Sequence, residues 1–349
     1  MKRFCVLRLS ALGDATHALA FIQALQALEP DAEVTWIIGK LERRLMEGLP
    51  NVELITFDKG AGLKGVFDLR RQLRGRRFDV LFHMQVAARA NLLSGLIRAP
   101  LRIGFDRARS RDGHGLFVNR RIAPAPGKHV IDGLLSFLPE AGLKVPERPT
   151  WRLPLAPGDL AFAQQHVDPA RRTLTISAVS SHALRNWLPE RYAQVADYAA
   201  GEHQMQVILA GAPTEFERQF NADIAARMSE PVLDLTGRDT LKELAGLLGA
   251  SDAVLAPDTG PMHIANALGT PVIGLHAASN PRRSGPYDSL RWCVDAYDEA
   301  ARKYRGKPAA ELRWGAKIEE EGVMELVTVE AVKQRLDALL AKKGSDNIS

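Results

Sequence analysis

The sequence has 349 residues, a formal net charge of +5, and hydrophobic and charged fractions of 46% and 25%. That balance is typical of a soluble globular protein, and the length is too great for one ordinary core, so about two domains are expected. Its only cysteines, Cys5 and Cys293, exclude a disulfide scaffold or a structural zinc site and indicate a reducing compartment.

The sequence shows no pattern of an export signal or a membrane-spanning helix. Arg8 and Asp14 interrupt the apolar stretch that an export signal requires. No run approaches the roughly 18 to 20 apolar residues that span a bilayer. We therefore expect a cytoplasmic protein that at most rests on a membrane.

The N-terminal half alternates strands with helices. A strand over residues 4–9 leads through a turn at 10–14 into a helix over 15–28, which ends before Glu29 and Pro30. Further elements are predicted in the same half, namely strands at 33–38, 52–57 and 78–83 and a basic helix near 65–74. This alternation predicts a parallel sheet with helices on both faces.

Basic residues gather in two stretches of this half. Residues 59–77 hold seven basic side chains against Asp68, and residues 98–121 hold seven arginines against Asp106 and Asp112. The clusters indicate an anionic partner, and the alternative for any single arginine is a solvated surface. Nucleic acid is a poor fit, because aromatic residues are sparse nearby and no recognised binding motif occurs.

A proline-rich stretch at 146–157 is the best candidate for a linker, and the alternation restarts after it. The predicted strands are 173–179, 206–210, 232–235, 253–256 and 271–275, and the predicted helices are 189–200, 214–228, 241–248, 261–268 and an amphipathic 329–340. We therefore predict domains at 1–150 and 151–328. The terminal helix and tail, 329–349, could pack back on the first domain.

Ligands of open parallel sheets bind where strands run into helices, so those turns carry the candidate site. The turn after 253–256 places Thr259 and Gly260 before a helix with Pro261 at its first position. Free N–H groups and the helix dipole there would bind a phosphate or diphosphate, and His263 could donate to the same group. The alternatives are an ordinary helix cap at Asp258 or Thr259 and a buried core histidine.

The turn after 173–179 offers Ser180, Ser181 and Arg185, whose guanidinium could bind two oxygens of a diphosphate. Arg185 could instead be an ordinary surface residue, and Trp187 could pack beneath the loop. In the first turn, Asp14 is either a helix cap or a general base, and spacing alone favours the cap.

Several other site types are not indicated by the sequence. The first turn contains Gly13 but not the G-x-G-x-x-G fingerprint, which argues against a nicotinamide-dependent oxidoreductase. No GxxxxGK[ST] loop, HExxH motif or cluster of cysteine and histidine ligands occurs, so no metal or cofactor is expected.

Taken together, the motifs resemble the ADP-heptose:lipopolysaccharide heptosyltransferases over roughly residues 3–290. The stretches that carry the resemblance are R-L-S-A-L-G-D at 8–14, R-I-G-F at 102–105, and D-T-G-P-M-H-I-A at 258–265, which continues into A-L-G-T-P at 267–271.

This resemblance implies an α/β fold of the GT-B type, with two Rossmann-like domains whose parallel sheets face each other across a cleft. It implies an N-terminal domain that binds the acceptor and a C-terminal domain that binds the nucleotide sugar. It places the catalytic base at Asp14. The implied donor-binding residues are Ser180, Ser181, Arg185, Glu215, Asp258, Thr259, Gly260 and His263. Glu215 would hold the ribose, and Arg185 stands where many relatives carry lysine.

The implied reaction is an inverting transfer of heptose from ADP-L-glycero-D-manno-heptose to Kdo of the lipopolysaccharide inner core. The segment 279–287 resembles enzymes that add the first heptose to phosphorylated Kdo, and second-heptose enzymes are the close alternative. Kdo-lipid A would be the acceptor, with Arg107, Arg109 and Arg111 as candidate contacts at the cytoplasmic face of the inner membrane. A non-catalytic sugar-nucleotide-binding protein is the alternative from another class.

Overall fold

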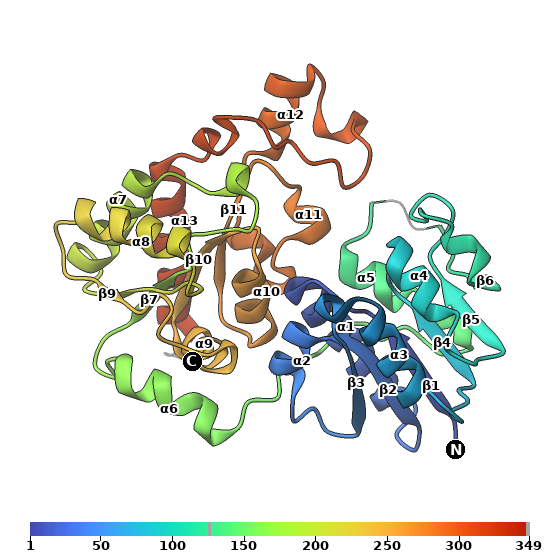
Figure 1. Cartoon of the computed structure of the whole chain (residues 1–349). Coiled ribbons are helices and arrows are strands. Elements are labelled where there is room, and N and C mark those ends of the chain that lie inside the picture. The colour runs from blue at the N-terminus through green and yellow to red at the C-terminus, as the bar shows by residue number, and fades with distance from the viewer. Residues whose placement is uncertain (125–126, 347–349) are drawn as a thin grey trace. The chain divides into compact units, whose positions relative to one another are not determined.

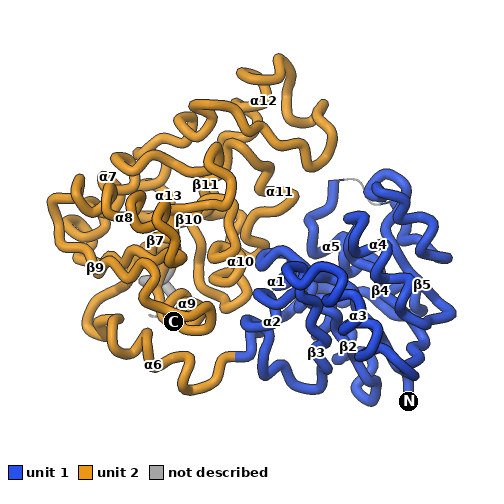
Figure 2. The backbone as a smooth tube through the Cα atoms, in the orientation of Figure 1, with its two compact units in different colours: residues 1–154 blue, residues 155–349 orange. Residues whose placement is uncertain are grey.

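The computed structural model describes residues 1–124 and 127–346 (Figure 1). The chain forms two compact units, residues 1–154 and residues 155–349, which Figure 2 distinguishes by colour. The boundary between the units falls within the proline-rich stretch 146–157. The last three residues of the predicted tail lie outside the described part of the chain.

Unit 1 is built on a six-stranded sheet with the order β3-β2-β1-β4-β5-β6, in which every neighbouring pair is parallel. The sheet order reverses direction between β1 and β4, which are hydrogen-bonded neighbours. The strands are β1 (Arg3–Leu7), β2 (Glu33–Gly39), β3 (Val52–Phe57), β4 (Val80–His83), β5 (Leu101–Gly104) and β6 (Arg120–Arg121).

The helices of unit 1 cover both faces of this sheet. They are α1 (Leu12–Leu28), α2 (Lys40–Met46), α3 (Gly62–Gln72), α4 (Ala88–Ser94) and α5 (Val130–Leu135), with short 3₁₀ turns η1 (Lys59–Ala61), η2 (His114–Leu116) and η3 (Pro139–Ala141). Alternate residues of β1 explain the two layers, because successive side chains of a strand point to opposite faces. Cys5 belongs to the apolar cluster that includes Leu69 of α3 and Leu93 of α4, whereas Phe4 stacks on Phe82 on the other side.

Unit 2 repeats the same topology. Its sheet order is β12-β11-β10-β7-β8-β9, again wholly parallel, and the order reverses between β7 and β10. The strands are β7 (Thr173–Ile176), β8 (Gln206–Leu209), β9 (Leu233–Asp234), β10 (Ala253–Pro257), β11 (Val272–His276) and β12 (Val294–Asp295). These two sheets confirm the predicted α/β class with two Rossmann-like units.

Helices and 3₁₀ turns complete unit 2. The helices are α6 (Pro157–His166), α7 (Pro189–Gly201), α8 (Glu215–Arg227), α9 (Leu241–Ala250), α10 (Gly260–Ala267), α11 (Pro281–Ser284), α12 (Tyr297–Arg305) and α13 (Val329–Asp346), and the turns are η4 (Ala183–Arg185), η5 (Tyr287–Trp292), η6 (Ala309–Glu311) and η7 (Val323–Leu326). The terminal helix α13 packs against α7 and β11 within this unit. Its predicted packing on the first domain stays a prediction. None of the described helices is both long and apolar enough to cross a bilayer.

Element ends differ from the sequence-based expectation in a consistent way. Helix α1 begins at Leu12 rather than at residue 15, so Asp14 lies inside its first turn. Strands β1 and β7 end earlier than predicted, at Leu7 and Ile176. Apolar residues beyond those ends, such as Leu9, are buried although they lie in loops. Buried loop residues have the same apolar character as strand residues, so the sequence predicts strands that are longer than the observed ones.

A buried polar cluster holds the loop after β5 in unit 1. The Oδ1 atom of Asn91 accepts from His83 Nε2 at 3.0 Å and from His114 Nδ1 at 2.9 Å, and His114 Nε2 accepts from the Phe105 N–H at 3.1 Å. These bonds require the His114 imidazole to be neutral, because its Nδ1 donates while its Nε2 accepts. Burial lowers the pKa of His83 to about 3 and that of His114 to about 4.

The cluster predicts an acid-sensitive unit 1. The unfolded chain takes up these protons near its ordinary histidine pKa of about 6.5, whereas the folded cluster resists protonation, so stability is full above that pH and falls below it. Hydrogen exchange in the peptide 80–121, corrected for intrinsic rates, should show a smaller opening free energy at about pH 5 than at about pH 7. His114→Gln should reduce the difference, and His203→Gln in unit 2 should not. Equal protection at both pH values would contradict this prediction.

Candidate active site

The strand-order reversal of unit 2 gathers the candidate donor site. Strands β7 and β10 are neighbours at the reversal, and the turns that follow their carboxyl ends carry Arg185 and Asp258. This is where an open α/β sheet leaves room for a ligand, since the connecting helices diverge to opposite faces. The two predicted turns therefore lie side by side, and the Ser180 hydroxyl donates to the Asp258 carbonyl at 3.4 Å.

Asp258 is the centre of an ionic cluster. Its Oδ2 accepts a hydrogen bond from Lys317 Nζ at 2.8 Å and lies 3.8 Å from Arg185 Nη1. Its Oδ1 lies 3.7 Å from Nε2 of His263. The Asp258 side chain is only 10% exposed, so it needs these partners to remain ionised in the folded unit.

The electrostatics of the cluster follow from burial and from opposite charges. Burial alone would raise the pKa of Asp258, but the interaction with His263 and the charge of Lys317 hold it well below its usual value. Burial lowers the pKa of Lys317, and the Asp258 charge opposes that shift. At the end of β11, burial lowers the pKa of His276 to about 4, so this imidazole is neutral at physiological pH.

The segment 316–319 supplies two charged residues that the sequence analysis missed. The Ile318 N–H donates to the Ala278 carbonyl at 2.9 Å, and the Ile318 side chain is fully buried in the core of unit 2. Lys317 and Glu319, on either side of it, reach the ionic cluster instead. The charged-apolar-charged alternation of K-I-E is the one sequence signal that could have indicated this arrangement.

Glu319 holds the arginine that was predicted to bind phosphate. Its Oε1 accepts from Arg185 Nε at 2.8 Å and from Nη2 at 2.6 Å, and its Oε2 lies 3.3 Å from His182 Nε2. Arg185 is therefore a partly buried, ion-paired residue, and its role in phosphate binding stays a prediction. Trp187 packs beneath the loop, where it is buried and donates to the Val327 carbonyl at 2.9 Å.

The start of α10 adds a backbone donor to the site. The Thr259 hydroxyl caps the helix by accepting from the Met262 N–H at 3.4 Å. Pro261 has no N–H, so the first turn offers the N–H of Gly260, which has no acceptor within the helix. The helix start thus adds the Gly260 N–H as a backbone donor beside the cations.

Two predicted donor residues lie outside the ionic cluster. Ser181 is exposed, and Glu215 is an exposed residue at the start of α8, after the β8 turn. Glu217 of the same helix is the residue that binds this turn, since its Oε2 accepts from the Ala212 N–H at 2.6 Å. The ribose-binding role of Glu215 stays a prediction.

Asp14 of unit 1 makes the capping contact that the sequence allowed, and its role as a general base stays a prediction. Its Oδ2 accepts from the Ala11 N–H at 3.1 Å, as a helix-capping carboxylate does, and lies 2.5 Å from Arg8 Nη2. Neither contact uses Oδ1, and the side chain is 37% exposed. Glu42 is a buried carboxyl of the same unit, whose pKa is raised by burial and also by the charge of Asp14.

The three candidate acceptor arginines differ in their surroundings. Arg109 is bound to buried Asp106, with Nε donating to Oδ2 at 2.6 Å, and its guanidinium lies 5.5 Å from the centre of the Phe105 ring. Arg107 and Arg111 are exposed. Arg109 therefore orders the loop, and the other two are the arginines of this loop that face solvent.

Comparison with known proteins gives a consistent result. The sequence model of glycosyltransferase family 9 (heptosyltransferase) matches residues 66–314. The lipopolysaccharide core heptosyltransferase OpsX of Haemophilus influenzae is 44% identical over 331 residues, which are 95% of either chain.

Solved structures share the fold at low sequence identity. A family 9 glycosyl transferase from Veillonella parvula has a TM-score of 0.80 at 22% identity, with 98% of this chain and 97% of that chain covered. E. coli heptosyltransferase WaaC with ADP has a TM-score of 0.73 at 17% identity, covering 97% and 99%. These likenesses confirm the predicted GT-B fold class.

The cluster predicts that Lys317 contributes directly to binding of a nucleoside diphosphate. Lys317→Ala should weaken ADP binding in calorimetry by about 10- to 100-fold, the usual effect of losing one charged hydrogen bond. Lys307→Ala is the matched control, because Lys307 is an exposed lysine of the same unit outside the cluster. Unchanged ADP affinity in Lys317→Ala would show that the diphosphate binds elsewhere.

Proposed function

The chain belongs to glycosyltransferase family 9, the heptosyltransferases, and from this membership we propose that it transfers heptose from ADP-L-glycero-D-manno-heptose to Kdo of the lipopolysaccharide inner core. The observation that carries the proposal is the convergence of Arg185, Lys317 and His263 on the turn before α10. Cations, an imidazole and a helix N-terminus at one point are suited to a diphosphate.

The donor would bind through exchange of ionic partners. The two cations Arg185 and Lys317 are balanced by the carboxylates of Asp258 and Glu319. A diphosphate brings further negative charge, so we propose that Arg185 turns part of its guanidinium from Glu319 to the phosphate oxygens. Asp258 keeps Lys317 and His263 oriented during this exchange.

The reaction would be a single displacement with inversion at the anomeric carbon. The acceptor hydroxyl loses its proton to the Asp14 carboxylate while its oxygen forms the new bond to the anomeric carbon. The bond between that carbon and the phosphate oxygen breaks, and ADP leaves with the electron pair. Preoriented donors that meet the growing phosphate charge are commonly the largest contribution to such catalysis.

The acceptor proposed here is Kdo-lipid A, at the cytoplasmic face of the inner membrane. The resemblance of segment 279–287 to enzymes that act on phosphorylated Kdo supports the first-heptose reaction, with second-heptose transfer as the alternative. Exposed Arg107 and Arg111 support an acceptor rich in phosphate and carboxylate groups.

Asp14→Asn tests the proposed base. We expect turnover, measured as ADP release with ADP-heptose and Kdo-lipid A, to fall by about 100- to 10,000-fold. ADP affinity should remain nearly unchanged, because the diphosphate ligands belong to unit 2.

Asp159→Asn is the matched control for loss of a helix cap. Asp159 occupies the same third helical position in α6, where its Oδ2 accepts from the Ala156 N–H at 2.7 Å. This variant should keep full turnover. If Asp14→Asn retains turnover as Asp159→Asn does, Asp14 is a structural cap, and a non-catalytic sugar-nucleotide-binding protein becomes the better description.

A further inference from the structure

Unusually exposed apolar side chains occur together in unit 1. Met1 aside, the large apolar residues with the highest exposure among the described residues are Leu116 at 88%, Leu63 at 77%, Leu92 at 69% and Phe67 at 66%. The next is Phe216 of unit 2, at 54%. Isolated exposed leucines are ordinary on a protein surface, so it is their shared position that needs an explanation.

These four side chains share one region of the fold. Leu63 and Phe67 lie in α3, which follows β3; Leu92 lies in α4, which follows β4; and Leu116 lies in η2, in the loop after β5. Parallel strands place their following segments at one edge of the sheet, the edge at which Asp14 also follows β1. The exposed apolar residues therefore lie in segments that start at the carboxyl edge of the sheet, where Asp14, the proposed base, also lies.

Helix α3 shows how the sequence produces this surface. Leu63 and Phe67 are separated by four residues and so lie on one helix face, whereas Gly65 and Leu69 are buried against the sheet. The helix thus has a second apolar face, which the core of unit 1 does not use. Arg70 extends that outer face by one turn.

The charges of the same segments are mainly positive once ion pairs are taken into account. Asp68 pairs with Arg71 and Asp106 pairs with Arg109, whereas Asp112 keeps its charge and accepts from the Ala88 N–H. Five exposed cations of α3, α4 and the loop after β5 have no ion pair within the described residues, namely Lys64, Arg70, Arg89, Arg107 and Arg111. The surface therefore has positive charge around its apolar side chains.

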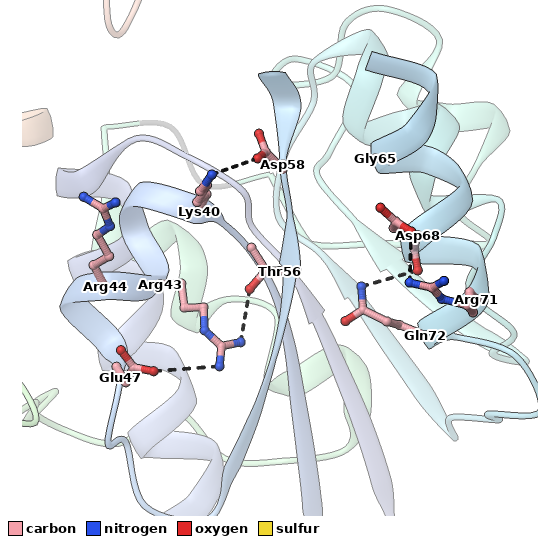
Figure 3. A pocket seen from close by; sticks show the side chains of 10 residues that line it. All are labelled: Lys40, Arg43, Arg44, Glu47, Thr56, Asp58, Gly65, Asp68, Arg71 and Gln72. Atoms are coloured by element: carbon pink, nitrogen blue, oxygen red, sulfur yellow. Dashed lines mark hydrogen bonds and ion pairs between the residues drawn. The ribbon is translucent and has the colours of Figure 1, made fainter. Parts of the chain in front are cut away.

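The neighbouring groove between α2 and α3 has a different character. It has a volume of about 480 Å³, and Figure 3 shows Lys40, Arg43 and Arg71 turned toward carboxylates. Lys40 pairs with Asp58 at 3.2 Å, and Arg71 pairs with Asp68 at 3.1 Å (Figure 3). The groove is nearly neutralised from within, so an anionic partner is attracted to the outer surface of α3 instead.

We propose that Leu63, Phe67, Leu92 and Leu116, with the five cations of the same segments, form a docking surface that inserts into the headgroup region of an anionic lipid bilayer. The inference deepens the proposed function and rests on it only for the lipid nature of the acceptor. Apolar side chains ringed by lysine and arginine are suited to an interfacial position, because the first enter the acyl boundary and the second bind headgroup phosphates. Docking at this edge would bring the lipid-linked acceptor to Asp14.

Vesicle binding tests the docking surface without any sugar substrate. Full-length protein should co-sediment with acceptor-free vesicles of phosphatidylethanolamine and phosphatidylglycerol, and much less with pure phosphatidylcholine. Leu63→Ser and Phe67→Ser should each weaken the partition coefficient by about tenfold. Val145→Ser is the matched control, because Val145 is 47% exposed on the same unit but outside the docking surface, and it should bind as the wild type does.

A fluorescent probe tests insertion directly. Cys5 and Cys293 are both buried, so Leu63→Cys can be labelled selectively with an environment-sensitive dye. Its emission should shift to the blue on anionic vesicles and be quenched by brominated acyl chains, whereas labelled Val145→Cys should show neither effect. Absence of both effects at position 63 would overturn the proposal.

Two further outcomes separate this inference from the proposed reaction. Leu63→Ser and Phe67→Ser should keep wild-type turnover on a deacylated, soluble acceptor and lose it only on acceptor in vesicles. If no acceptor is glycosylated but wild-type protein still inserts into vesicles, the reaction is wrong and the docking surface stands. If the wild type sediments as a dimer that Leu63→Ser dissociates, with no vesicle binding, the surface joins two copies of the chain and the lipid proposal is wrong.

Discussion

Parallel pairing of every strand is the constraint on which the rest of the structure depends. Each parallel connection must cross the sheet, so all carboxyl ends of a unit meet at one edge and all chemistry-bearing turns gather there. In unit 2 this brings Arg185 and Asp258 together from turns far apart in sequence. In unit 1 it places Asp14 at the same edge as the exposed apolar and basic segments. The two units share one topology but differ in the turns at this edge. Unit 2 therefore has an ionic cluster there, and unit 1 has apolar and basic segments.

A buried carboxylate gives the donor site its order. Asp258 would be costly in the core of unit 2 without partners, and its partners would repel one another without it. The turns of β7 and β10 and the segment 316–319 all contribute to this neutral cluster, whose charged groups hold one another in place. A diphosphate would meet cations whose orientation is already fixed, and preorganisation of this kind lowers the reorganisation needed during the reaction. Glu319 has the complementary role of holding Arg185 in place until the phosphate competes for it.

Local patterns in the sequence predict most of this framework, and tertiary contacts explain what they miss. Alternating strands and helices predict both sheets, and D-T-G-P before an apolar helix predicts the phosphate turn. Lys317 and Glu319 could not be predicted in the same way, because their segment lacks regular structure and is positioned by the Ile318 backbone contact with Ala278. Sequence spacing also could not decide whether Asp14 is a helix cap or a general base. The capping hydrogen bond uses Oδ2 and leaves Oδ1 available, so the two roles do not exclude each other. The engagement of Arg109 by Asp106 likewise depends on a turn that composition does not reveal.

The central claim is that this chain adds heptose to a phosphorylated Kdo of the lipopolysaccharide inner core. Mass spectrometry of Kdo-lipid A, with and without a phosphate on Kdo, after incubation with ADP-heptose and the protein tests it most directly. The account predicts that the phosphorylated acceptor gains the mass of a single heptose and that the unphosphorylated acceptor does not. Failure to add heptose to either acceptor, while ADP-heptose still binds at the Asp258 cluster, would contradict the claim.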